Sequence, residues 1–156
     1  MDELYRAHAL GLIRLALVLV GDRESAQDVV QDAFVGLYRA WPRLRDPAKA
    51  PGYLRTAVIN GARSVLRARN RSRLLRLHYD PPVWSAEAAV MVREERRAVL
   101  AAVARLSRRQ REVLALRYYA GLSHAEIAET LSITTGTVAS TLSHAMAALA
   151  RELGEM

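Results

Sequence analysis

Two carboxylates at helical spacing are the first residues in this sequence that could do chemistry. Asp28 and Asp32 would lie on one face of a helix, where such a pair can bind a metal ion or take part in acid–base catalysis. No histidine stands beside the pair at a ligand spacing, and the chain has no cysteine. We therefore expect no enzymatic activity, no metal and no cofactor. With Gln31 and Val35 nearby, the pair is better interpreted as a surface for arginines of a partner.

Basic charge is concentrated in one stretch of the chain. The net charge is +7, and residues 43–76 hold ten basic residues against one acid, a net +9, so the rest of the chain sums to −2. A cluster of this kind is typical of a surface that binds a polyanion, most often nucleic acid. An ordinary solvated helix face is the alternative. Arg63, Arg67 and Arg71 repeat at helical spacing, so a basic helix would place them together.

The sharpest local pattern lies toward the end of the sequence. Ser123 and Glu126 have the spacing of a capping box, which predicts a helix that begins at Ser123. Residues 132–134 then form a three-residue turn, and Val138 and Leu142 give the following helix a buried stripe. This pattern favours a helix-turn-helix, in which the second helix enters a major groove. An unrelated helical hairpin is the alternative.

Helices must position all of these residues, because the apolar pattern has a helical period nearly throughout and nowhere alternates long enough to predict a strand. We expect Gly21 to end the first helix, Asp22 to cap the second and Ser107 to cap a later one. The predicted helices cover residues 2–20, 22–40, a short stretch through 53–58, 61–77 after an interruption at Asn60 and Gly61, 86–106, 108–120 and two shorter segments beyond.

The predicted fold class is all-α, with two small helical domains. They cover residues 1–77 and 87–156, and an extended linker over residues 78–86 joins them, because Pro81 and Pro82 disfavour helix there. The longest apolar run, residues 15–20, is far shorter than the ~20 residues of a membrane-spanning helix. We expect no export and no membrane insertion, and a cytoplasmic, nucleoid-associated protein.

Two sets of segments resemble a known family, the extracytoplasmic-function (ECF) sigma factors of bacterial RNA polymerase. One set is similar to the fourth conserved region of these proteins and the other to the second, and the form of residues 50–55 is similar to the short SigE-type group of actinobacteria. The matching segments are residues 106–118, 121–128 and 136–140 for region four, and residues 26–34 with Leu37 and Trp41 for region two.

This resemblance implies a function, partners and site residues. A sigma factor directs promoter recognition and DNA melting for transcription initiation as a subunit of the polymerase, so the implied partners are the polymerase core and promoter DNA, with an anti-sigma factor as a further candidate. The implied polymerase contacts are Asp28, Gln31, Asp32 and Val35. The implied minus-ten contacts are Tyr53, Ile59, Asn60, Arg63, Arg67 and Arg71. The implied minus-thirty-five contacts are Arg117, Thr135, Thr137, Ser140, Thr141 and His144.

The expected turn at Ile59 and Asn60 would catch a flipped base of the minus-ten element, a step that costs a few kcal/mol of unstacking. Asn60 as a helix cap is the competing interpretation.

The sequence departs from the family pattern in the recognition helix. No arginine or lysine occurs between Ser123 and Ala150, so few counterions would be released from DNA there. Arginines on the preceding helices could carry the backbone contacts instead; they are Arg105, Arg108, Arg109, Arg111 and Arg117. Two alternatives stay open, a helix-turn-helix regulator that acts without polymerase and a protein-docking module. The first leaves the segment from Asp28 to Trp41 unexplained.

Overall fold

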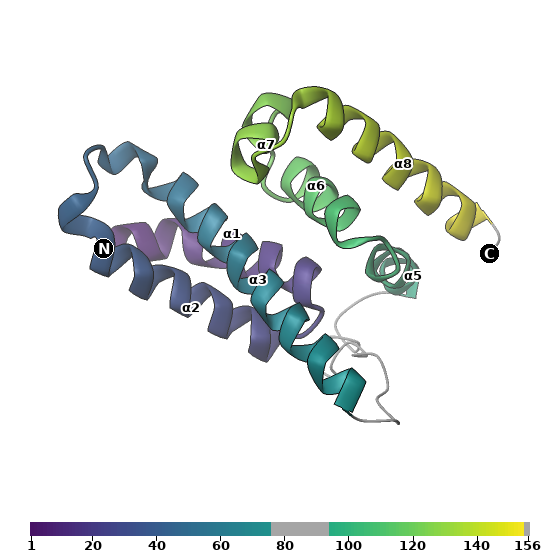
Figure 1. The fold of residues 1–156 in the computed structure, drawn as a ribbon, viewed down its shortest axis with the longest axis horizontal. Helices are drawn as coiled ribbons and strands as arrows, with labels where there is room; N and C mark the ends of the chain where they lie inside the picture. The colour runs from purple at the N-terminus through teal and green to yellow at the C-terminus, as the bar shows by residue number, and fades with distance from the viewer. Residues whose placement is uncertain (76–93, 155–156) are drawn as a thin grey trace. The chain divides into compact units, whose positions relative to one another are not determined.

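A computed structural model describes residues 1–75 and 94–154, and these residues form helices and connecting turns with no strand (Figure 1). The chain divides into two compact units, Met1–Trp84 (unit 1) and Ser85–Met156 (unit 2). The predicted all-α class is therefore confirmed. The predicted linker, residues 78–86, and the inner limits of both predicted domains lie outside the described residues. None of the helices described in either unit is both long and apolar enough to cross a membrane.

Unit 1 is a three-helix bundle in which each helix contacts the other two (Figure 1). Its helices are α1 (Asp2–Val20), α2 (Arg23–Ala40) and α3 (Ala50–Leu75), and the short 3₁₀ helices Trp41–Arg43 and Pro47–Lys49 connect α2 to α3. The core consists of apolar side chains from all three helices, including Leu15, Leu19, Val30, Leu37, Leu54 and Val58.

Local sequence determines where α1 ends and α2 begins. Gly21 adopts φ 85°, a left-handed conformation that glycine reaches without strain, and its N–H donates to the carbonyl of Leu17. The Asp22 carboxylate then accepts a hydrogen bond of 2.8 Å from the N–H of Ser25. Both cap predictions are confirmed.

The predicted interruption at Asn60 and Gly61 is wrong, because α3 runs through these positions as one helix of 26 residues. A Cβ atom on Gly61 would lie 3.0 Å from Cγ1 of Val29, so glycine serves here for the close approach of α2 and α3. Ile59 is only 2% exposed and packs in the core. The helix expected through residues 53–58 also begins earlier, at Ala50, since Pro51 is tolerated in the first turn of α3.

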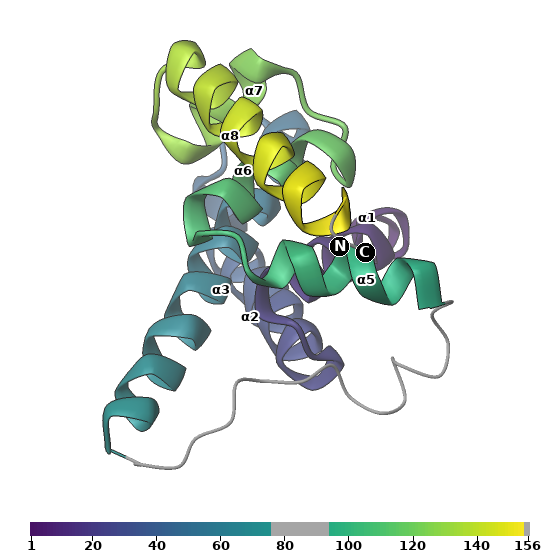
Figure 2. The ribbon, with the colours of Figure 1, turned by 90° about the vertical axis from the view of Figure 1, so that its right-hand side faces the viewer.

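Unit 2 is organised around its last helix. Its helices are α5 (Glu94–Ala104), α6 (Arg108–Tyr118), α7 (His124–Leu131) and α8 (Thr135–Gly154), and α8 packs against the other three (Figure 2). We expected short helices at this end, but α8 has 20 residues. It continues because the buried positions Val138, Ala145 and Leu149 keep a helical period to its last turn.

The helices α6 and α7 start at Ser107 and Ser123 as the sequence predicts, and both starts are capping boxes, although the sequence predicted one only at Ser123. Ser107 and Gln110 exchange side-chain and backbone hydrogen bonds, and Ser123 and Glu126 do the same. Ser132 ends α7 in the left-handed conformation, φ 57°, which turns the chain into α8. The helix-turn-helix prediction is thereby confirmed in its geometry.

The Gly61 contact predicts different outcomes for alanine at two helical glycines. Alanine in place of an interior glycine stabilises a helix by about 1 kcal/mol. Gly11→Ala should show this gain in the free energy of unfolding, since no atom lies within 4 Å of its added Cβ. Gly61→Ala should show little or none, because its Cβ meets Val29. Urea unfolding followed by Trp41 fluorescence in a Trp84→Phe background measures both. Adding Val29→Ala should restore the gain at Gly61, and equal gains at the two glycines in the native background would contradict this account.

Candidate protein and nucleic-acid interfaces

The outer face of α2 carries all four predicted polymerase contacts. Asp28, Gln31, Asp32 and Val35 are exposed, while the opposite face of the helix packs in the core through residues that include Phe34. Neither carboxylate forms an ion pair with any described residue, and no cluster of three potential metal ligands occurs among the residues that the structure describes. The acidic pair is therefore available to a partner.

Apolar side chains extend this face beyond the predicted residues. Tyr38, three residues after Val35, is 68% exposed, and Trp41 is 37% exposed at the end of the helix. Exposed aromatic side chains beside charged ones are typical of protein interfaces. Sequence reasoning included Trp41 in the family match but missed Tyr38, although the spacing of 28, 31, 35 and 38 follows one helix face.

The Tyr53 side chain is partly buried against α2 and partly exposed. A Cβ atom on Gly36 would be 3.4 Å from the Tyr53 hydroxyl, so the phenol of this α3 residue reaches across α2 at Gly36. The side chain is 37% exposed. It therefore links the start of α3 to α2 while part of its ring stays accessible.

The outer face of α3 brings together most of the predicted minus-ten residues. Asn60, Arg67 and Arg71 are exposed, and Arg63 is half-buried. Ser64 joins them, since its hydroxyl donates to the Asn60 carbonyl at 3.2 Å and accepts from Arg67 at 3.1 Å.

Two interpretations of residues 59 and 60 need correction. Asn60 lies inside α3, so it is not a helix cap. The Ile59 side chain lies in the core, so in this conformation it cannot contact a base.

One arginine of the basic stretch, Arg69, faces the helical bundle and not the solvent. Arg69 has a side chain only 17% exposed, which forms an ion pair with Asp22. It also donates to the carbonyl of Val20 and, at 3.1 Å, to the hydroxyl of Ser25. The basic stretch is thus divided between an exposed face and one inward-facing guanidinium, a distinction that its sequence spacing alone does not make.

Five of the six residues assigned to the minus-thirty-five element are exposed, four on the recognition helix α8 and one on α6. Thr135, Thr137, Ser140 and His144 are exposed on α8, Arg117 is exposed on α6, and Thr141 is half-buried.

Several hydroxyl groups at the start of α8 already have partners. Thr134 accepts from the N–H of Thr137 at 3.1 Å, and the two threonine hydroxyls lie 2.9 Å apart. Ser140 donates to the Thr137 carbonyl at 3.3 Å. Fewer of these groups are free for bases than the sequence suggests.

A buried carboxylate holds two of the arginines that could have replaced the missing basic residues of α8. Glu112 is 2% exposed and accepts from Arg108 at 3.2 Å, and Arg109 lies 3.9 Å away. Burial lowers the pKa of the neighbouring Arg111 guanidinium from its ordinary value, and the charge of Glu112 opposes that shift.

The remaining arginines of this group also have partners within unit 2. Arg111 donates to the carbonyl of Ala104 at 3.3 Å, and Arg117 donates to that of Leu122 at 3.1 Å. Arg105 forms an ion pair of 3.4 Å with Glu152. These side chains are partly committed to the fold of unit 2.

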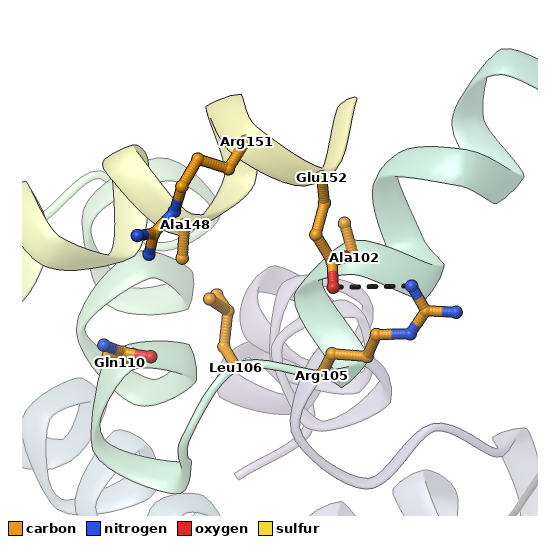
Figure 3. Close-up of a pocket in the computed structure, with 7 residues that line it drawn as sticks. All are labelled: Ala102, Arg105, Leu106, Gln110, Ala148, Arg151 and Glu152. Carbon is orange, nitrogen blue, oxygen red and sulfur yellow. Dashed lines mark hydrogen bonds and ion pairs between the residues drawn. The ribbon is translucent and has the colours of Figure 1, made fainter. Parts of the chain in front are cut away.

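A pocket of about 320 Å³ lies where α5, α6 and α8 meet (Figure 3). The Arg105 and Glu152 pair lies on one side of it, and Gln110 and Arg151 lie on the other. Apolar side chains of Ala102, Leu106 and Ala148 complete the lining.

Comparisons with known proteins agree with this arrangement. The family model of Sigma-70 region 2 matches residues 4–72, and that of Sigma-70, region 4 matches residues 96–149. The chain is 35% identical over 156 residues to the RNA polymerase sigma-E factor of Streptomyces avermitilis, covering 97% of this chain and 84% of that protein. It is 35% identical over 164 residues to the ECF RNA polymerase sigma factor SigL of Mycobacterium tuberculosis, covering 100% of this chain and 90% of that protein.

A solved structure has the same fold. The structure of the sigma factor RpoE in complex with the anti-sigma factor NepR from Bartonella quintana has a TM-score of 0.79 to this chain at 21% identity, covering 99% of this chain and 98% of that one. Two family regions in the expected order, together with relatives matched over nearly the full chain, establish the family. The chain belongs to the sigma-70 family of RNA polymerase sigma factors, as one of its extracytoplasmic-function members.

Proposed function

We propose that this sigma factor directs promoter recognition and melting with unit 1 as its main binding unit, through the outer faces of α2 and α3. The observation that carries the proposal is the separation of two exposed faces on one bundle. The face on α2 is acidic and aromatic, with Asp28 and Asp32, and the face on α3 is basic, with Arg67 and Arg71. Faces of opposite charge suit different partners.

The α2 face fits the polymerase core. Asp28, Asp32 and Gln31 offer acceptors for arginine and lysine side chains, and Val35 and Tyr38 offer apolar area that a partner can bury. Because the opposite face of α2 forms the core of unit 1, docking needs no unfolding of the bundle.

The α3 face fits the minus-ten element. Arg63, Arg67 and Arg71 can bind phosphates, and Asn60 and Tyr53 can bind or stack on a base that leaves the duplex. Ile59 is not part of this proposal, since it packs in the core. The energy of these contacts would offset the cost of unstacking, so the protein needs no catalytic step of its own.

Unit 2 would contact the minus-thirty-five element weakly. The exposed groups over residues 135–150 of α8 are uncharged, and the nearby arginines are engaged by Glu112, Glu152 and main-chain carbonyls. We propose that unit 2 also contacts the polymerase core, through the pocket between α5, α6 and α8. Protein docking is therefore the second candidate function of unit 2, favoured by the lack of arginine and lysine over residues 135–150 of its recognition helix.

An anti-sigma factor is a further proposed partner, of the kind found with the similar Bartonella quintana protein. The proposed location is the cytoplasm, on the nucleoid, where promoters and polymerase are found. A run-off transcription assay with cognate core polymerase tests the whole proposal. The full chain should initiate at promoters selected by the holoenzyme, and a helix-turn-helix regulator that acts alone would bind DNA without core and give no transcript.

The acidic face predicts the first variant phenotype. Asp28→Arg with Asp32→Arg should abolish binding to core polymerase while the helix content stays native, because both side chains are exposed and unpaired among described residues. Fluorescence titration with core polymerase measures the affinity. Glu129→Arg, an exposed reversal on α7, is the control and should bind normally. Normal core affinity of the double variant would refute the assignment of this face.

The basic face predicts a change in salt dependence. Each phosphate contact contributes about 0.9 to the slope of log affinity against log salt concentration. Arg67→Glu with Arg71→Glu should therefore flatten the slope of holoenzyme binding to promoter DNA by about 2 and weaken binding at every salt concentration. Arg14→Glu on α1, also exposed, changes the net charge without touching this face and should leave the slope unaltered. An unchanged slope in the double variant would mean that the two arginines form a solvated surface.

The neutral recognition helix predicts that added charge will help. His144 is exposed on α8, whereas Thr141 is half-buried, so an arginine is accommodated better at 144. His144→Arg should add a phosphate or guanine contact and raise promoter affinity by about 1 kcal/mol. His144→Gln should not. Titration of promoter DNA with reconstituted holoenzyme measures both, and if His144→Arg binds no better, unit 2 is chiefly a protein-docking surface.

A further inference from the structure

We propose that Arg69 is a positioning residue that holds the second half of α3 against the corner between α1 and α2, and thereby keeps Arg67 and Arg71 oriented toward DNA. The proposal rests on the proposed promoter contact of α3. Arg69 itself contacts no DNA in this scheme, because its guanidinium faces the bundle.

The apolar packing of α3 weakens over residues 63–72. Among residues 50–72, whose burial the structure describes, the buried ones are Ala50, Leu54, Val58, Ile59 and Ala62. Val65 and Leu66 are only half-buried. Position 69 follows 62 and 65 at helical spacing, so it is the next position on the inward face. The sequence places an arginine there in place of an apolar residue, and polar contacts take over from the core.

The partners of Arg69 are the ends of the other two helices. The Val20 carbonyl belongs to the last turn of α1, where carbonyls lack a helical donor, and Arg69 supplies one. Asp22 caps α2 through one carboxylate oxygen, 2.8 Å from the N–H of Ser25, and binds Arg69 through the other. Ser25 adds its hydroxyl at 3.1 Å. One side chain thus joins α3 to segments 44 to 49 residues away.

The exposed arginines depend on this anchor through helix geometry. Successive residues of an α-helix are about 100° apart, so residues two positions before and after an inward one point outward. With Arg69 fixed inward, Arg67 and Arg71 are held on the outer face, where both are exposed. Without the anchor, the largest apolar side chains over residues 63–72 of α3 would be Val65 and Leu66, which are only half-buried. Only molecules in which this part of α3 is packed against α1 and α2 would then hold both arginines toward DNA.

The test compares Arg69→Gln with Arg67→Gln in the full chain. Amide hydrogen exchange over residues 66–72 reports docking without DNA, and Arg69→Gln should lose protection there while Arg67→Gln does not. If only a fifth to a tenth of molecules keep this part of α3 packed against α1 and α2, the promoter dissociation constant of the holoenzyme rises about five- to tenfold. The salt slope should stay unaltered in Arg69→Gln, since the bound state keeps its phosphate contacts. It should fall by about 0.9 in Arg67→Gln.

Asp22→Asn is the matched variant for the other side of the anchor. Asparagine caps helices as well as aspartate does, so α2 keeps its cap while Arg69 loses its ionic partner. This variant should reproduce the loss of protection, and the double variant with Arg69→Gln should add little to either single one.

Native protection in Arg69→Gln, or a drop in its salt slope without loss of protection, would overturn the positioning role. If protection is lost in Arg69→Gln but neither it nor Arg67→Gln alters promoter affinity, the anchor exists and the proposed promoter contact of α3 is wrong.

Discussion

The close approach of α2 and α3 at Gly61 is the contact on which the rest of unit 1 depends. It lets α3 continue as one helix past the position where Asn60 and Gly61 would otherwise favour a turn. At 1.5 Å per residue, its 26 residues span about 39 Å. Tyr53 near one end and Arg71 near the other are therefore carried by a single rigid element. A broken helix would have left their relative positions to a loop.

The same bundle gives unit 1 its two different outer faces. Because the core takes one side of α2 and one side of α3, each helix has only its outer residues left for partners. On α2 these residues are acidic and aromatic, and on α3 they are basic. Arg69 points inward, so its positive charge is not on the exposed face of α3 and instead binds the ends of α1 and α2 at Val20 and Asp22. Arginines of this unit therefore occur both on an exposed face and in contacts that join the helices to one another.

Unit 2 distributes its charge in the opposite way. Its recognition helix has no charged side chain over residues 135–150, and Arg105 and the arginines of α6 are held by Glu112, by Glu152 and by main-chain carbonyls. An arginine that already has an acceptor gives up part of that contact when it binds a phosphate. Its net contribution to the free energy of DNA binding is therefore smaller. The two units thus differ in their exposed side chains. Unit 1 has a basic face, and residues 135–150 of the recognition helix in unit 2 are uncharged and rich in hydroxyl groups. This difference fits a protein whose promoter affinity depends on the polymerase that holds both units.

The sequence alone determined what is local. Gly21 with Asp22, Ser107 with Gln110 and Ser123 with Glu126 act over a few residues, so the starts and stops of their helices could be predicted, as could the all-α class, the helix-turn-helix and the family. The exposed face of α2 also followed from helical spacing, because the apolar residues on its other side are unambiguous. Tertiary structure decided the rest. Gly61 is a turn residue or a packing residue depending on Val29, which is 32 positions away, and that choice put Ile59 in the core. Arg69 differs from Arg67 and Arg71 only through partners 44 to 49 residues distant, and Arg108 is held by a carboxylate whose burial no local pattern specifies. Periodicity shows which residues share a face, but which face is buried, and which charge already has a partner, depends on contacts between helices.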